Sequence, residues 1–445
     1  MRGIAWIRPV MALVACTPIS TAQPHYSSLA STISSERVSA TIHTLAAFGT
    51  RHTLSDPAST TRGIGAARAW IKSQLDGMGP NMAARFEEFD APKLPRIPNG
   101  AKLVNVVGVV RGTSTPDDIV YVLAHYDSMC ADVMDSKSDA PGANDDASGV
   151  AAALEVARVV AAHPLKCTLV VVFTAGEEQG LVGATYRANQ AAANHEFIRG
   201  VLNNDIIGDP TSPHAGASPH GGSTPRLVRV LSEGLPRDAS AEALAKIRLT
   251  SAENDSQSRQ LARYIAFVAR EERTAVQPML VFRPDRFLRG GDHQPFLDNH
   301  FPAVRFAQVD EDYTREHANV TTKDGKPYGD VPDYVDFAYV ADVARLNLAT
   351  AAWLANAPRA PANARIVTAK LDIDTTIRWD ASPGAASYEV VWRDTTAPDW
   401  QESQGTAAVT EVTLPINKDN FFFGVRAVGG DGLRSPVTFC GAAKE

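Results

Sequence analysis

Five short segments of the chain carry histidine and carboxylate side chains at spacings that suit a metal site. In the first segment, His125 and Asp127 are two residues apart, so on an extended backbone both side chains point to the same side. A metal-bound histidine needs an acidic or carbonyl partner on its other ring nitrogen, and Asp127 offers one. Taken alone, the two residues also fit an ordinary hydrogen-bonded surface pair, so the case for a metal site depends on the other segments.

Two further segments carry adjacent carboxylates. Asp145 and Asp146 open an apolar helix, and Asp146 can cap that helix while Asp145 faces a site. Glu177 and Glu178 directly follow an apolar strand, where two negative charges are costly unless something positive is near. No Lys or Arg lies in that segment, so a metal ion is the natural compensation, and distant basic residues are the alternative.

The last two segments contribute one residue each. Asp205 lies between apolar residues and is expected to be buried, whereas His317 lies in a loop, where a lone histidine is usually just exposed. Taken together, the five segments form a mixed nitrogen and oxygen set. Zinc binds such sets in catalytic sites and keeps a position open for water. One carboxylate can bridge two zinc ions that lie roughly 3.5–4 Å apart, which leaves one glutamate free to act as a base.

Strands and helices must alternate to bring these segments together. Strands are predicted at residues 103–110, 119–124, 169–173, 200–202 and 303–306, and the second and third are nearly continuous apolar runs, as expected of strands covered on both faces. Residues 23 to about 95 are expected to be helical, and further helices are predicted at 148–163, 183–193, 227–235 and 332–356. The pattern predicts an α/β fold, a three-layer sandwich around a mixed, partly parallel sheet whose strand ends carry the site.

From His125 to Asp324 the chain resembles the M28 family of metallopeptidases, of the bacterial leucyl-aminopeptidase type. The order His-x-Asp, Gly-Ala-x-Asp-Asp-x-Ser-Gly, Glu-Glu, Asp and a loop His is similar to that family's signature. The resemblance implies a zinc aminopeptidase that acts on peptide substrates with two zinc ions. The implied ligands are His125, Asp145 and Asp205 for one zinc, and Asp145, Glu178 and His317 for the other.

The resemblance also implies a mechanism. The two cations would lower the pKa of a shared water molecule, and Glu177 would take its proton and pass it to the leaving amine. Asp127 would orient His125, and Asp146 would brace its own loop, where family members often have a cis peptide. One position departs from the family pattern, because Leu288 stands where the best-known members have a tyrosine that holds the scissile carbonyl.

The replacement for the missing tyrosine and three alternative functions stay open at this stage. Arg286, Arg289 or Tyr313 can replace the missing tyrosine, or the arginines can simply be solvated. A glutaminyl cyclase would use one zinc on the same fold, and a carboxypeptidase or dipeptidase would use a basic residue to grip a carboxylate. A binding ectodomain without metal would have lost ligands or the base, and this chain has lost neither.

The C-terminal part has a different composition. Residues 23–357 form the predicted zinc peptidase domain, residues 358–364 a linker, and residues 365–445 an all-β module. Trp379 and the segments 388–392 and 423–428 resemble those of a fibronectin type III domain. Such a module can bind a polymer, a surface or the peptidase domain, or it can be a stabilising appendage.

Charge and cysteine content narrow the setting of the protein. Residues 1–22 are predicted to be an export signal, with a lipid anchor at Cys16 as the alternative. After its removal, Cys130, Cys167 and Cys440 remain without CxxC spacing, and the first two can pair or simply be buried. The formal net charge of −7 argues against nucleic acid as a partner, and no later stretch is apolar enough to span a membrane.

Overall fold

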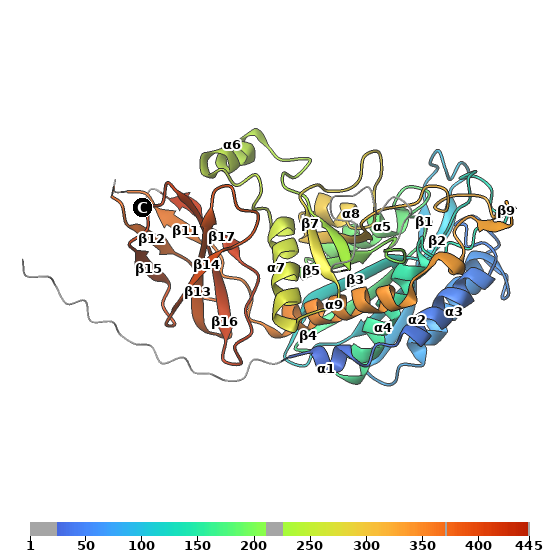
Figure 1. Ribbon diagram of the computed structural model, residues 1–445, viewed down its shortest axis with the longest axis horizontal. Coiled ribbons are helices and arrows are strands. Elements are labelled where there is room, and N and C mark those ends of the chain that lie inside the picture. Colours follow the sequence, from blue (N-terminus) through green and yellow to red (C-terminus); the bar gives the residue numbers. More distant parts are fainter. Residues whose placement is uncertain (1–24, 211–225, 370–371, 444–445) are drawn as a thin grey trace, which may run out of the picture.

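The computed structural model describes residues 25–210, 226–369 and 372–443, and its larger part is built on one eight-stranded sheet (Figure 1). The strand order is β1-β2-β4-β3-β5-β8-β6-β7. In the middle, the four strands β4, β3, β5 and β8 run parallel to one another, so their carboxyl ends share one edge of the sheet. Their bounds are Cys167–Thr174 (β4), Thr115–His125 (β3), Phe197–Asn204 (β5) and Ala303–Gln308 (β8). The outer strands are Met82–Ala91 (β1), Ala101–Val110 (β2), Leu227–Leu231 (β6) and Gln277–Val281 (β7).

Helices cover both faces of this sheet, which confirms the predicted three-layer sandwich. One layer contains α2 (Ser35–Ala47), α3 (Gly63–Asp76), α4 (Ala147–Ala162), α7 (Gln257–Glu272) and α9 (Phe337–Asn356). The other layer contains α5 (Val182–Ala193) and α8 (Gln294–Asp298). The strand β4 is buried throughout and β3 is buried from Val120 onward, because both faces of the sheet are covered there.

Three of the predicted elements are wrong in type or length. The predicted helix at 227–235 is the strand β6, because its apolar residues fit both periods and pairing with β7 and β8 decides between them. The predicted helical region up to residue 95 also contains the strand β1. The helix predicted from residue 332 begins only at Phe337, where the Asp336 side chain accepts a hydrogen bond from the Tyr339 amide.

The remaining helices of the described residues are α1 (Ser27–Ala30), α6 (Ala241–Thr250) and the short 3₁₀ helix Pro332–Tyr334.

The C-terminal part is all-β, as predicted, and consists of two four-stranded sheets with the orders β15-β12-β11-β18 and β14-β13-β16-β17. It lies beside α7 (Figure 1), and the linker region between α9 and β11 spans residues 357–364. The likeness to a fibronectin type III domain and the exact domain limits stay predictions. The strands are Arg365–Val367 (β11), Thr375–Arg378 (β12), Ala385–Asp394 (β13), Glu402–Thr406 (β14), Glu411–Leu414 (β15), Phe421–Gly429 (β16), Thr438–Phe439 (β17) and Gly441–Ala443 (β18). A separate hairpin, Thr321–Lys323 (β9) and Lys326–Tyr328 (β10), follows β8 in the chain.

Several predictions concern residues at or beyond the described ranges. The predicted export signal at residues 1–22 and the alternative lipid site at Cys16 lie outside them. Cys130 and Cys167 are both free and buried, so they do not pair with each other. Among the helices of the described residues, none is long and apolar enough to cross a bilayer.

Candidate functional site

The candidate ligands lie where the central parallel strands end. His125 is the last residue of β3, Glu177 and Glu178 follow β4, and Asp205 follows β5. His317 lies in the loop after β8, and its backbone has a positive φ of 52°. Because neighbouring parallel strands end at the same edge of the sheet, residues up to 192 positions apart in the sequence meet there.

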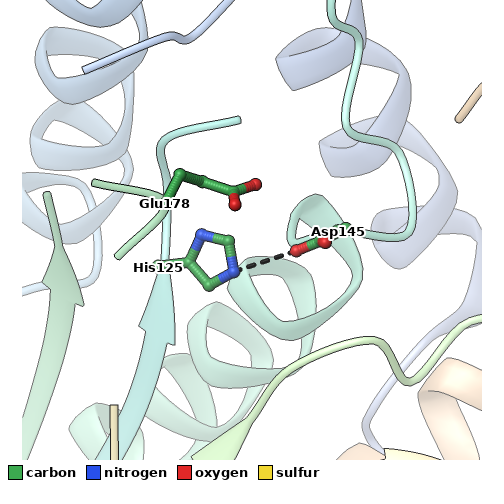
Figure 2. Close-up of side chains that lie close together, drawn as sticks. All are labelled: His125, Asp145 and Glu178. Atoms are coloured by element: carbon green, nitrogen blue, oxygen red, sulfur yellow. Dashed lines mark ion pairs between the residues drawn. The ribbon is translucent and has the colours of Figure 1, made fainter. Parts of the chain in front are cut away.

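Asp145 is the residue that the two histidines share. Its Oδ1 lies 3.0 Å from Nε2 of His125, and its Oδ2 lies 2.9 Å from Nε2 of His317. Figure 2 shows His125 and Asp145 facing each other with Glu178 close by. Glu178 Oε2 lies 3.2 Å from His317 Nε2, and Asp205 Oδ1 lies 3.9 Å from His125 Nε2. The structure therefore brings together all five residues predicted from the sequence, in two groups that overlap at Asp145.

The donor atoms of these groups fit zinc. Zinc bonds of about 2.0–2.1 Å in a tetrahedral site place two ligand atoms roughly 3.3 Å apart, and the distances above scatter around this value. Nε2 of His125, Nε2 of His317 and Oε1 of Glu178 are buried and make no hydrogen bond. Buried polar atoms without a hydrogen bond are rare, so these three atoms suit the role of metal ligands.

Asp127 supports both His125 and the two glutamates. Nδ1 of His125 lies 3.2 Å from the Asp127 carbonyl oxygen and 3.6 Å from its carboxylate. The same carboxylate accepts hydrogen bonds from the backbone amides of Glu177 (3.3 Å) and Glu178 (3.2 Å), and from the hydroxyl of Thr53 (2.7 Å). Asp127 thus fixes the ring of one histidine and the turn that carries the glutamates.

Asp146 both caps the helix α4 and braces the loop that carries Asp145, so the two roles considered for it coexist. Its carboxylate accepts a hydrogen bond from the Gly149 amide at the start of α4 and another from the His125 amide. The peptide bond between Asp145 and Asp146 is cis, as the family resemblance implies. Both carboxylates are thereby held at the amino end of α4, with Asp145 turned toward the histidines.

A buried arginine ties two of the site loops together. The guanidinium of Arg51, which has no exposed surface, donates to the backbone carbonyls of Tyr126 (2.7 Å) and Gly142 (2.9 Å). Gly142 has a φ of 49°, and a Cβ there would lie 2.4 Å from the Asp145 carbonyl oxygen, so only glycine fits. The Asp330 carboxylate adds hydrogen bonds of 2.8 Å from the backbone amides of Asn144 and Asp145. No sequence motif marks Arg51 or Asp330, and their role is visible only in the tertiary structure.

Charges are crowded around these residues. Burial raises the pKa of Glu177 well above its usual range; Asp205 and Glu178 add to the rise and His125 opposes it. For His317, burial lowers the pKa, but Glu178 and Asp145 together raise it to about 12. Added positive charge in this region would stabilise the ionised carboxylates. Asp205 already has one cationic partner, because Nη2 of the buried Arg305 lies 2.7 Å from its Oδ1.

Leu288, at the position where the family pattern has tyrosine, is fully exposed and has a φ of 57°. It lines the cavity above the site together with Arg286 and Arg289, whereas Tyr313 lies under the guanidinium of Arg289. Of the residues weighed as replacements for the tyrosine, the two arginines therefore reach this cavity. A further lining residue, Arg96, has no signal in the sequence.

Comparisons with known proteins agree with this geometry. Residues 105–328 match the model of peptidase family M28. A protein of Leptosphaeria maculans described as a probable zinc metalloprotease is 43% identical over 414 residues, which cover 92% of this chain and 94% of that protein. A second probable zinc metalloprotease, from Pyricularia oryzae, is 42% identical and covers 90% of this chain and 81% of its own length.

Solved structures share the fold at low sequence identity. An aminopeptidase from Aneurinibacillus sp. strain AM-1 has a TM-score of 0.51 at 14% identity and covers 74% of this chain and 95% of its own. A glutaminyl cyclase from Fimbriiglobus ruber has a TM-score of 0.50 at 17% identity and covers 72% of this chain and 95% of its own. The fold alone therefore does not choose between these two activities. The match to the family model and the similarity to the two zinc metalloproteases along nearly the whole chain show that this chain belongs to peptidase family M28 and is a zinc metallopeptidase.

Proposed function

We propose that the protein is an exported aminopeptidase that removes N-terminal residues from peptides with two zinc ions in one site. The observation that carries the proposal is the position of Asp145, whose two carboxylate oxygens face two different histidines. A carboxylate in this position can bridge two cations. The proposed ligands are His125, Asp145 and Asp205 for one ion, and Asp145, Glu178 and His317 for the other.

The chain's own residues divide the chemical work. Bound zinc would supply a water molecule of lowered pKa and would stabilise negative charge on the scissile carbonyl oxygen. Glu177, which lines the cavity beside the ligands, accepts the proton of the attacking water and delivers it to the leaving amine. Asp127 keeps Glu177 in place through the backbone amide, and it keeps the ring of His125 in its orientation.

The proposal also covers the setting of the enzyme. Residues 1–22 act as a cleaved export signal, residues 23–357 form the peptidase domain, and residues 365–445 form a non-catalytic domain after a short linker. The order of the site segments supports removal of N-terminal residues, because it resembles that of bacterial leucyl aminopeptidases. A free peptide N-terminus and the scissile carbonyl would then lie within the same cavity.

Metal content and substrate choice test this proposal together. The full mature chain is assayed on an amino-acyl substrate, an acyl-blocked peptide and a peptide with N-terminal glutamine, with and without chelator. We expect two zinc ions per chain, and we expect turnover of the free amino-acyl substrate that the chelator abolishes. Turnover of only the blocked peptide would contradict the aminopeptidase proposal, and one zinc with cyclisation of the glutamine peptide would indicate a glutaminyl cyclase.

Replacing the proposed base tests the mechanism. Glu177→Ala should keep both zinc ions, because Glu177 is not among the proposed ligands, and should lower kcat by about 10²–10⁴-fold or more. Glu88→Gln, which changes an exposed glutamate on β1, is the matched control and should retain wild-type activity. Near-normal activity of Glu177→Ala would show that another group takes the proton.

A further inference from the structure

An open cavity of about 410 Å³ lies above the candidate metal site. Among the described residues, the basic side chains that line it are His317 and three arginines. The three arginines come from two separate segments: Arg96 from the loop between β1 and β2, and Arg286 and Arg289 from the loop after β7. They differ in whether a carboxylate of the protein already neutralises them. That difference decides which of them is available to a substrate.

Arg286 and Arg289 are already paired. Nη1 of Arg286 lies 2.5 Å from Oε2 of Glu311, and Nη1 of Arg289 donates to Oε1 of Glu316. Both glutamates are buried, so these pairs are shielded from solvent on the protein side. A substrate carboxylate would have to compete with a resident carboxylate at either arginine.

Arg96 is held at the cavity but has no acidic partner among the described residues. Its Nη1 donates a 2.6 Å hydrogen bond to the carbonyl oxygen of Glu178. The turn that carries it is closed by two backbone hydrogen bonds between Leu94 and Ile97, and Ile97 is fully buried. The guanidinium is therefore anchored through one nitrogen, and its other donors are left for a ligand.

The carboxylates that line the cavity all have a proposed role in the metal site. They are Asp145, Glu177, Glu178 and Asp205, which are the proposed metal ligands and the proposed base. Two divalent ions would balance these four negative charges, and among the described lining residues Arg96 would then remain as the arginine without a neutralising carboxylate. Among the described residues, no further carboxylate lines the cavity to pair with Arg96.

We propose that Arg96 binds a substrate carboxylate next to the scissile bond, so that the preferred substrates are short peptides with a negative charge at that place. The charge can be the α-carboxylate of a dipeptide or an acidic side chain on the residue after the scissile bond. Arg96 offers the planar, charge-assisted contact that suits a carboxylate. This inference rests on the proposed function, because it assumes that the bond is cleaved at the same metal site.

Four substrates with the same N-terminal residue test the inference: Leu-Leu, Leu-Leu-amide, Leu-Glu-amide and Leu-Gln-amide. Each is assayed with the full zinc-loaded chain and with Arg96→Gln and Arg96→Lys. Lys93→Gln removes a charge from the same loop at an exposed position outside the cavity and is the matched control. Binding of Leu-Leu to the Glu177→Gln chain, with and without Arg96→Gln, gives the comparison by calorimetry without turnover.

We expect the wild type to prefer a charged substrate over its neutral partner by about tenfold in kcat/KM, mainly through KM. Arg96→Gln should remove this preference, Arg96→Lys should keep part of it, and Lys93→Gln should keep all of it. A preference for Leu-Leu over its amide identifies the α-carboxylate, and a preference for Leu-Glu-amide over Leu-Gln-amide identifies a side chain.

Three results would overturn the inference. The first is a wild type that cleaves the acids and amides equally, which would leave the proposed peptidase activity intact. The second is an unchanged preference in Arg96→Gln. The third is an equal loss of kcat on all four substrates in Arg96→Gln, which would mean that Arg96 only positions the Glu178 backbone. Failure of the wild type to cleave any peptide would instead contradict the proposed function, and the inference with it.

Discussion

Replacing Asp255 with asparagine is expected to destabilise the contact between the peptidase sheet and the C-terminal sheets. The Asp255 carboxylate lies just before α7 and is fully buried. It contacts Arg263 of α7 at 3.1 Å and Arg393 of β13 at 2.7 Å, and it also accepts a 2.8 Å hydrogen bond from Gln260. One carboxylate therefore neutralises two guanidinium groups, one from each side of the contact.

The size of the effect follows from this burial. The side chains of Arg263 and Arg393 are only 2% and 3% exposed, so neither can turn to water when its partner is lost. Removing one partner of a buried ion pair costs about 3–5 kcal/mol. Asparagine keeps the shape and one acceptor, so we expect Asp255→Asn to lie near the lower end, at roughly 3 kcal/mol. That is a large share of the 5–15 kcal/mol typical of a folded domain.

Calorimetric and urea unfolding of the full chain measure this loss. The wild type should unfold with the two parts coupled, and Asp255→Asn should unfold earlier, with the C-terminal sheets separating first. Glu242→Gln, which breaks an exposed ion pair with Lys246 on α6, should leave the unfolding curve unchanged. If Asp255→Asn changes the free energy of unfolding by less than about 0.5 kcal/mol, the buried charges do not hold the two parts together.

Two further changes probe the surroundings of the site. Asp330→Asn should weaken zinc binding by about 10–100-fold in a chelator competition assay. The reason is that the asparagine side chain has one acceptor oxygen and cannot accept hydrogen bonds from the backbone N–H groups of both Asn144 and Asp145. An unchanged affinity for zinc would exclude this bracing role of Asp330. Burial raises the pKa of Asp285, but Arg305 and other cations lower it to about 2, below its ordinary 3.8. Its stabilising effect is therefore present above pH 3.8 and lost as the pH falls toward 2. The melting temperatures of the wild type and Asp285→Asn should accordingly converge across that window, and a constant gap would refute the assignment.

The sequence predicts the central sheet well because burial on both faces leaves a simple pattern. The strand β4 and residues 119–124 of β3 are almost continuous apolar runs, and the polar residues that follow them stand out for that reason. The strand β6 is harder, because its apolar residues suit a helix and a strand equally, and only pairing with β7 and β8 decides. The helix α7 is not among the predicted elements, although it carries the contact with the C-terminal sheets.

The residue types and their order along the chain were thus enough to determine the family, the α/β fold and the set of side chains that can bind zinc. This is possible because ligand chemistry is local: a histidine or carboxylate after an apolar strand is visible without knowing its neighbours. The tertiary structure alone shows which oxygen of Asp145 faces which histidine, because the parallel strands bring these residues together where they end. The same holds for the arginines, since Arg286 and Arg289 pair with glutamates, whereas Arg96 has no such partner within the described part of the chain. Charge pairing depends on distances across the fold, and these are set by packing rather than by spacing along the chain.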